Sequence, residues 1–551
     1  MSFSSRRRNY MLVPHRRDGL IEWMKSMLMH SFVLNALDST CADTFEHFEI
    51  LIEEHRQYQN SKTRIGQSRL KHLVPTVGDF HTPLPLRRAF HAYNAKYALT
   101  SRRHICITFN ELRHILNLAQ IMALAGYTSS TSPHDGEDCV DRWVTDEPVK
   151  EAISTTTNQF EAYRQALSPQ NNSHREKEFS EGQEKHHQQE GRNSSTFQGP
   201  TMISFDGDQT LYSDGENFES NPTLAHYIYL LLKHGVTIAV VTAAGYEYHT
   251  EKYEFRLSGL LKFFEERKLT PEECDRFYLF GGECNYLLKL GSDYHLHPVK
   301  ELGPGGWMTA TRHTIPESPG AWKDSDVSAL LDIAENTLRQ SSEDQRLRSR
   351  VIRKKRGVGL VPQPRTYIPR EALDETVLRV QECLRAANVR GLPYCAFNGG
   401  KDCWVDVGNK KVAVQVLQCY LGLDHPADDQ TSNSTLHIGD QFLNTGNDFA
   451  ARGVCPCVWI TSPEETTYIL KSILRLAGVS LGDHHKESLE DLLHKTPQKQ
   501  AIDTVAVEND LSEVTRRTML MDVYTGEMIG QAACDAKLGE SKINVVENKT
   551  D

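Results

Sequence analysis

Residues 203–211 are the part of this 551-residue chain that most restricts how it can fold. A short hydrophobic run ends on Asp206, and Gly207 and Asp208 follow directly. Glycine lets the chain turn here, which places two carboxylates at the C-terminal end of a strand, where open α/β sheets build their sites. Neighbouring carboxylates repel unless a cation lies between them, and Mg²⁺ prefers such oxygen ligands. The alternative is an ordinary Asp-Gly turn in a hairpin.

Three later segments favour the site over the turn. A β-branched run ends on Thr242, a second strand-like run is followed by Lys410, and a third ends on Asp440, with Asp448 eight residues later. The order Asp-x-Asp-x-Thr, Thr, Lys and Gly-Asp resembles the haloacid dehalogenase superfamily of phosphohydrolases. The resemblance predicts an α/β fold: a haloacid-dehalogenase-like Rossmannoid core with an inserted α+β cap and a helical N-terminal domain.

The same resemblance suggests catalytic roles. Asp206 would attack phosphorus and form an aspartyl-phosphate. Asp208 would protonate the leaving alcohol and then activate water. Thr242 would donate a hydrogen bond to a phosphoryl oxygen, and Lys410 would neutralise the nucleophile and the phosphate. These four residues are the expected catalytic and phosphate-binding set.

The metal ligands expected from the resemblance are Asp206, the Asp208 carbonyl and Asp440, which together would hold Mg²⁺. The superfamily usually has a second acidic residue about four positions after the metal-binding Asp. Here that position is Asn444, and the acid is Asp448. We therefore expect Asp448, with Asn444 as the alternative, to anchor the lysine or a metal-bound water.

The identity of the lysine is open among Lys401, Lys410 and Lys411. We favour Lys410, because it follows the strand-like run and opens an apolar helical pattern at residues 412–417. Lys401 precedes that strand, where a solvated loop residue is expected.

Spacing locates the cap. Thr242 lies only 36 residues after Asp206, whereas Lys410 lies 168 residues after Thr242. Only the second interval has room for a cap, which we place at residues 246–395 between two core segments, 200–245 and 396–484. Inside the cap we expect two strands joined by a Gly turn at residues 276–288, and helices at 327–340 and 370–387. A cap that closes over the site favours small substrates over proteins.

Four segments together resemble the IMP-specific 5′-nucleotidases of fungi and some protists: residues 205–215, 242–246, 398–410 and 439–448. The resemblance covers roughly residues 10–165 and 200–480. It implies hydrolysis of inosine monophosphate (IMP) to inosine and phosphate, dependence on Mg²⁺, allosteric activation by ATP and a homotetramer. A capped sugar-phosphate phosphatase or phosphomutase of the same superfamily is the alternative, because it would share every motif.

The family likeness also suggests residues that hold the nucleotide, namely Asp214 and Arg256. The alternatives are a turn residue for Asp214 and a helix-surface charge for Arg256. Asp406 would reach the substrate or orient the lysine. A run of four cations at residues 353–356 would clamp an anionic nucleotide, unless it is a solvated face or a nuclear-import signal.

Residues 1–165 should form a helical regulatory and oligomerisation domain. Helical patterns occupy residues 18–37, 42–57, 83–97 and 108–124, and the last begins with a capping box from Thr108 to Glu111. By resemblance this domain would carry the ATP site. Arg113 and His114 are candidates for phosphate contacts, with plain surface charges as the alternative.

Composition bounds the remaining possibilities. A net charge of −11 and a pI near 6.1 argue against general nucleic-acid binding, and no apolar run approaches a membrane span. The twelve cysteines are scattered without paired metal spacing, which suits a reducing cytosol. Residues 1–17 lack the apolar centre of a secretion signal, although a mitochondrial presequence is an alternative. We expect a disordered linker at residues 166–199 and a mostly disordered tail at 485–551.

Overall fold

The computed structural model describes residues 18–33, 38–61, 66–101, 107–127, 197–213, 216–218, 221–387, 389, 391–423, 435–479 and 481. Residues 1–17, most of the predicted linker, Asp214 and the tail at 485–551 lie outside these ranges. The described residues up to 479 belong to one compact unit, which contains every element below. Within the described ranges, no helix is both long and apolar enough to cross a membrane.

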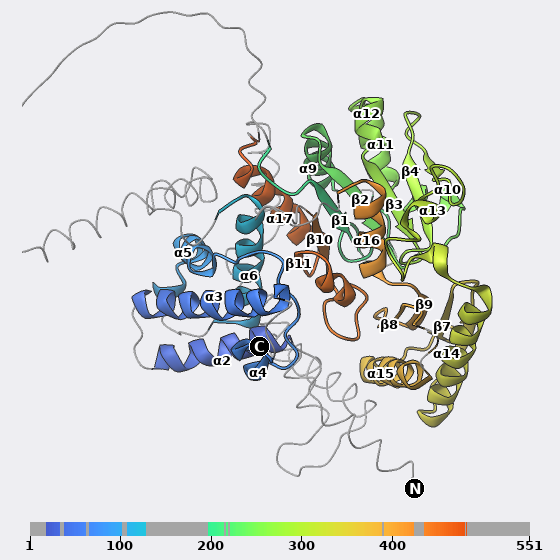
Figure 1. Cartoon of the computed structure of the whole chain (residues 1–551), viewed down its shortest axis with the longest axis horizontal. Helices are drawn as coiled ribbons and strands as arrows, with labels where there is room; N and C mark the ends of the chain where they lie inside the picture. Colours follow the sequence, from blue (N-terminus) through green and yellow to red (C-terminus); the bar gives the residue numbers. More distant parts are fainter. Residues whose placement is uncertain are drawn as a thin grey trace, which may run out of the picture. The chain divides into compact units, whose positions relative to one another are not determined.

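A seven-stranded sheet forms the centre of this unit, with the strand order β11-β10-β1-β2-β3-β4-β5 (Figure 1). The first five strands in this order are parallel, and β4 and β5 are antiparallel additions at one edge. The strands are short, and apart from the edge strands β5 and β11 they are largely buried, as in parallel sheets covered on both faces. Their bounds are β1 (Met202–Phe205), β2 (Thr237–Val241), β3 (Phe277–Gly281), β4 (Tyr286–Leu290), β5 (Leu296–Pro298), β10 (Thr435–Gly439) and β11 (Cys457–Trp459).

Helices cover the sheet, because successive side chains of a strand point to opposite faces. On one face, Met202, Ala239 and Phe280 share a core cluster with α13 (Trp307–Thr311) and α16 (Lys410–Tyr420). The strand residues that point to the opposite face are also buried. On that face, α9 (Pro222–Lys233) contacts β2 and packs against α11 (Ser258–Glu266) and α17 (Pro463–Leu476). The mixed α/β class with a mostly parallel sheet is therefore confirmed.

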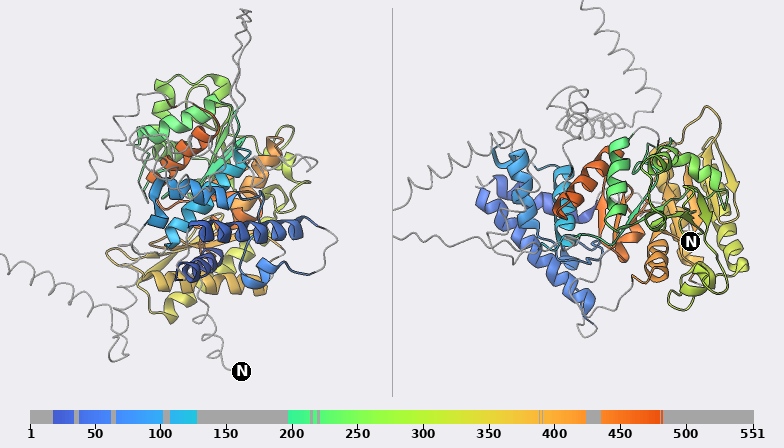
Figure 2. Two further views of the ribbon diagram at one scale, coloured as in Figure 1. Left: turned by 90° about the vertical axis from the view of Figure 1, so that its left-hand side faces the viewer. Right: turned by 90° about the horizontal axis from the view of Figure 1, so that it is seen from above.

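A second, four-stranded antiparallel sheet has the order β6-β7-β9-β8. Its strands are β6 (Ser349–Arg353), β7 (Gly357–Pro362), β8 (Tyr394–Asn398) and β9 (Cys403–Val407). Two amphipathic helices, α14 (Asp324–Asp344) and α15 (Arg370–Ala387), pack side by side on it (Figures 1 and 2). Both helices were predicted, with α14 extending beyond the expected ends.

The two sheets do not follow the cap boundaries that we expected at residues 246 and 395. The predicted strand pair at 276–288 forms as β3 and β4, but β3 pairs with β2 in the seven-stranded sheet. Conversely, β9 and its neighbour β8, most of which we had assigned to the core, belong to the four-stranded sheet. Sequence patterns identify a strand but not its hydrogen-bonding neighbour. The division into domains itself stays a prediction.

Four N-terminal helices form within a few residues of the predicted ranges, whereas the short helix at Arg69–Leu73 was not predicted. Phe45 stacks on Phe90 between two of the predicted helices, with ring centroids 4.7 Å apart. The predicted capping box is confirmed, because Thr108 and Glu111 exchange both of its hydrogen bonds. The helices are α2 (Gly19–Val33), α3 (Asp38–Asn60), α4 (Arg69–Leu73), α5 (Leu86–Tyr97) and α6 (Phe109–Leu124).

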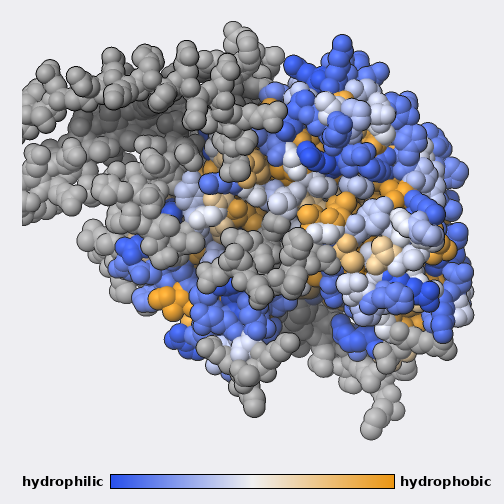
Figure 3. Space-filling view, turned by 45° about the horizontal axis from the view of Figure 1, so that its top comes forward, coloured by the Kyte–Doolittle hydropathy of each residue, from blue (hydrophilic) through white to orange (hydrophobic). Residues whose placement is uncertain are grey.

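The remaining helical elements are short. They are α10 (Thr250–Arg256), α12 (Pro271–Cys274), η1 (Leu99–Ser101), η2 (Pro319–Ala321) and η3 (Phe449–Gly453). Figure 3 shows hydrophobic residues in small patches among hydrophilic ones on one face of the molecule. Scattered apolar patches of this kind are ordinary on protein surfaces.

Candidate active site

Three predicted site residues directly follow neighbouring parallel strands. Asp206 follows β1, Thr242 follows β2 and Asp440 follows β10. Main-chain bonds continue the pairing past the strand ends, since Asp206 N donates to Ile438 O over 2.9 Å. The carboxyl ends of adjacent parallel strands meet at one edge of the sheet. The site residues of separate motifs therefore lie close together at this edge of the sheet.

The acidic cluster consists of Asp206, Asp440 and Asp448, each with a carboxylate oxygen within 4.8 Å of the others. Burial raises the pKa of Asp206 to about 7 and raises the pKa of Asp440 well above its ordinary value. Asp440 Oδ1 is buried without a hydrogen-bond partner. Crowded buried carboxylates with a free oxygen fit a hard divalent cation, which would offset their repulsion.

Lys410 is fully buried beside this cluster, at the start of α16. Its Nζ lies 2.7 Å from Asp206 Oδ1 and 2.6 Å from Asp448 Oδ1. Burial alone would lower the pKa of Lys410, but the surrounding carboxylates raise it, so the ammonium is protonated at neutral pH. Of the other two candidates, Lys401 is exposed in a turn, and Lys411 pairs with Glu317.

Asp448 is held by three donors. Besides Lys410, its Oδ2 accepts from Gln441 N over 2.8 Å, and its Oδ1 lies 2.9 Å from His437 Nε2. Burial would raise the pKa of Asp448, but Lys410 and His437 hold it below its ordinary value. A side chain on Gly439 would collide with this carboxylate, which explains the glycine there. The structure thus places Asp448 beside the lysine.

His437 was missed by the sequence analysis. It lies in the middle of β10, fully buried, with Nδ1 2.9 Å from Ser204 Oγ. Burial lowers its pKa, so the ring is neutral and donates to Asp448 through Nε2. A histidine inside an apolar strand gave no signal, because its partners come from other parts of the chain.

Asp208 has a side chain that is 38% exposed and pairs with Arg256 at the end of α10. The Arg256 guanidinium also lies 4.6 Å from the centre of the Tyr212 ring. Between Asp206 and Asp208, a side chain on Gly207 would strike the Tyr212 hydroxyl. Arg256 is therefore at the site and is not the surface charge that was its alternative.

Asp406 is not one of the two carboxylates that bond Lys410. It is a buried residue of β9, and burial raises its pKa to about 7. It faces Gly357 of β7, where a Cβ atom would collide with its carboxylate. Lys410 bonds Asp206 and Asp448 instead.

Glu283 is a second residue that the sequence analysis missed. It is fully buried after β3 with a positive φ of 65°, and its Oε1 accepts from Asn447 Nδ2 over 3.2 Å. Its Oε2 has no hydrogen-bond partner. Burial raises the pKa of Glu283 to about 8, against the pull of Lys410. The two glycines before it were the only available signal.

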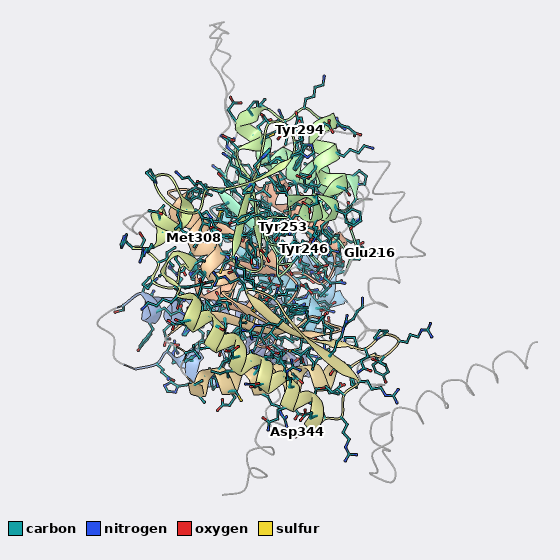
Figure 4. The ribbon with its side chains drawn as sticks, turned by 90° about the vertical axis from the view of Figure 1, so that its right-hand side faces the viewer. Glu216, Tyr246, Tyr253, Tyr294, Met308 and Asp344 are labelled. Carbon is teal, nitrogen blue, oxygen red and sulfur yellow. The ribbon has the colours of Figure 1, made fainter. Side chains whose placement is uncertain are left out.

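Aromatic residues line the loop after Thr242. The rings of Tyr246 and Tyr253 lie 5.1 Å apart (Figure 4), and the Tyr253 hydroxyl accepts from Tyr246 N over 2.9 Å. Tyr248 and Tyr286 form an edge-to-face pair at 5.4 Å. These contacts fix the loop that carries Thr242.

Two groups of basic residues are engaged within the protein. In the run at 353–356, Arg353 pairs with Asp332 and Glu335 of α14, and Lys354 lies 4.1 Å from the Trp404 ring centre. Arg113 is 2% exposed and makes a two-point ion pair with Glu465. Arg113 is thus a buried structural cation, which differs from both of its expected roles.

Comparison with known proteins identifies the family. A family model described as IMP-specific 5′-nucleotidase matches residues 2–470. The chain is 34% identical over 498 residues to IMP-specific 5′-nucleotidase 1 of Neurospora crassa, covering 85% of this chain and 97% of that one. It is 32% identical to the Plasmodium falciparum protein of the same name, covering 84% of each.

Solved structures agree. The chain resembles a mutant of Plasmodium falciparum IMP-nucleotidase with IMP bound, with a TM-score of 0.62 at 32% identity, covering 84% of this chain and 94% of that one. It also resembles the ATP-bound form, with a TM-score of 0.60 at 33% identity over 83% and 85% of the two chains. With a matching family model over most of its length and relatives above 30% identity, this chain belongs to the IMP-specific 5′-nucleotidase family.

Proposed function

We propose that this protein is a Mg²⁺-dependent phosphomonoester hydrolase that converts IMP to inosine and phosphate. The observation that carries the proposal is the buried Lys410 between Asp206 and Asp448, beside Asp440, at one sheet edge. The substrate is taken from the family and from the IMP-bound relative. The core would be haloacid-dehalogenase-like, as the motif order suggests.

The reaction would take place in two displacements. In the first, a carboxylate oxygen of Asp206 bonds to phosphorus, the bond to the 5′ oxygen of the nucleoside breaks, and Asp208 gives that oxygen its proton. In the second, water attacks phosphorus and gives a proton to Asp208, and the bond to Asp206 breaks. Phosphate leaves and both carboxyl groups return to their starting states.

The cation site would comprise Asp206, the Asp208 carbonyl and Asp440. A bound Mg²⁺ supplies positive charge that stabilises the phosphoryl oxygens. Lys410 adds a second positive charge beside Asp206, which favours the ionised nucleophile. Thr242 would donate its hydroxyl proton to a phosphoryl oxygen.

The nucleotide would be held outside the phosphate site by Arg256, Asp214 and Asp406. Arg256 would orient Asp208 as well, and the ion pair between the two side chains supports this role. A pairing of this kind fixes the carboxyl group that transfers the proton.

Phosphate release from a panel of phosphomonoesters, with IMP included, tests the function. IMP should have the highest kcat/KM; a preference for a sugar phosphate would favour the sugar-phosphate phosphatase or phosphomutase instead. Asp208→Asn should reduce kcat by about 10²–10⁴, and Asp206→Asn should reduce it further, with both variants folded. Near-normal turnover by Asp206→Asn would contradict the covalent mechanism.

Regulation forms a second part of the proposal. We infer that ATP activates the enzyme through the N-terminal domain and that the enzyme is a cytosolic homotetramer. The support is the family resemblance and the ATP-bound Plasmodium falciparum relative. Measuring IMP hydrolysis against ATP concentration, beside the mass in solution, tests both points.

A further inference from the structure

Trp459 connects the proposed cation site to a distant part of the chain. It is the last residue of β11, and its Cα pairs with Gly439 in the strand register. Its indole Nε1 donates to the main-chain oxygen of Asp440 over 2.7 Å. Ile460 N donates to Gly439 O over 2.9 Å. Trp459 and Ile460 therefore bond the main chain at Asp440 and at Gly439, the last residue of β10.

The other side of Trp459 is held by helix α6. Asn117 Nδ2 donates to Trp459 O over 2.6 Å, and Asn117 Oδ1 accepts from Trp459 N over 3.1 Å. The amide thus occupies the place of a neighbouring strand along β11, which ends the sheet. Buried main-chain groups need such partners, and a side-chain amide offers one donor and one acceptor together.

Arg113 fixes α6 in this position. Its Nη1 donates to Trp459 O over 2.6 Å, and its guanidinium binds both carboxylate oxygens of Glu465 at 2.8 and 2.9 Å. Glu465 lies in the first turn of α17. The ring of Phe109, also on α6, meets the Trp459 indole edge to face at 5.7 Å. A two-point guanidinium–carboxylate pair is directional, so α6 is held at a fixed distance from β11.

A cavity adjoins this connection. It has a volume of about 110 Å³, and its lining includes Arg113, Asn117, Phe442, Arg452 and Trp459. On this side the indole contacts Phe442, with ring centroids 6.4 Å apart, and Arg452, whose guanidinium carbon lies 6.0 Å from the ring centre. Its bond to the Asp440 carbonyl adds a directional constraint on the main chain at Asp440.

We propose that Trp459 is a positioning residue through which α6 fixes Asp440 at the cation site. The inference rests on the proposed role of Asp440 as a cation ligand. Without the indole donor, the Asp440 carbonyl loses its partner and the loop relaxes, so the carboxylate is no longer held ready for the cation. The N-terminal helices would therefore contribute to cation affinity, in addition to any part in regulation.

The test is Trp459→Phe in the full-length chain, which removes the donor and keeps an aromatic ring against Phe109. Mn²⁺ binding followed by electron paramagnetic resonance should weaken about tenfold, the lower end for residues that orient metal ligands. The KM for IMP at saturating Mg²⁺ should stay unchanged. Trp322→Phe is the matched control, because its indole donates to a main-chain oxygen of Glu317 over 2.9 Å, and its Mn²⁺ affinity should match wild type.

Asn117→Ala tests the other end of the connection and should weaken Mn²⁺ binding in the same direction. A folded Trp459→Phe protein, judged by thermal unfolding without cation, that binds Mn²⁺ like wild type would overturn the proposal. If Trp459→Phe does not fold, unchanged binding by Asn117→Ala overturns it. Asp440→Ala tests the cation site separately from the role of Trp459. If this variant binds Mn²⁺ normally, Asp440 is not a cation ligand.

Discussion

At the scale of single residues, the site is a line of buried polar groups. Asp206 bonds Lys410, Lys410 bonds Asp448, Asp448 accepts from His437, and His437 bonds Ser204. Each charged group has a partner of opposite charge or a neutral donor, which offsets much of the cost of burial. Removing Asp206, Lys410 or Asp448 alters the charge balance of this buried group, whereas removing His437 or Ser204 removes a hydrogen bond.

Lys410→Ala should lose about 10²-fold or more of kcat, because it leaves Asp206 and Asp448 without their shared cation. Lys401→Ala, in an exposed turn, is the matched control and should retain near-normal turnover. Phosphate release from IMP measures both. The reverse pattern would assign the catalytic lysine to position 401.

Glu283 predicts a pH effect on stability. Its pKa is about 8 in the folded protein, above the ordinary value of a glutamate, so the stability tied to its neutral form is full at low pH and is lost as pH rises towards 8. Glu283→Gln cannot ionise and can still accept from Asn447. In the absence of cation, the free energy of unfolding of Glu283→Gln should rise relative to that of wild type by up to about 1.4 kcal/mol per pH unit between roughly pH 5 and 8.

Urea unfolding at several pH values measures this difference. A constant difference between the two proteins across the range would show that Glu283 is ionised throughout.

At the scale of elements, α6 begins with a capping box and carries the side chains that bond β11. Thr108→Ala removes the capping side chain and should cost about 1 kcal/mol of stability. Thermal unfolding measures the loss. Thr309→Ala, outside this helix, is the comparison. An equal loss of stability in both variants would mean that the capping box contributes no more than the threonine hydroxyl at position 309.

At the scale of the whole molecule, we expect residues 170–196 to be dispensable for catalysis and residues 1–165 to be needed for regulation. Deleting residues 170–196 should leave IMP hydrolysis nearly intact. Their composition predicts a disordered segment, and a change in the length of such a segment changes its closure entropy slowly. Removing residues 1–165 should abolish ATP activation and tetramer formation.

That second deletion also removes Arg113 and Asn117, so it should weaken cation binding even without ATP. IMP hydrolysis against ATP, beside a sizing column, measures the outcome. A shortened protein that is still tetrameric and still activated would place the effector site in the core or the cap.

The sequence by itself determined the order of the motifs and several of the helices and strands. Hydrophobic periodicity and the residues that begin or end an element are local features. A short apolar run ending on Asp206, or a capping box at Thr108, can be recognised from a few neighbouring residues. The choice of Lys410 over Lys401 could be argued because the first residue of a helix after a strand points to a sheet edge. Family likeness supplied the substrate and the cofactors, which no local pattern contains.

Only the tertiary structure decided which distant groups meet. His437 and Glu283 gave no usable signal, because their partners lie in other segments. The sheet that takes β3 or β9 depends on hydrogen bonds between strands far apart in the chain, so strand pairing could not be derived from spacing. Arg113 looked like a surface charge until its bonds to Glu465 and Trp459 were seen. Burial and pairing are properties of the folded chain, and they turn ordinary residues into parts of a site.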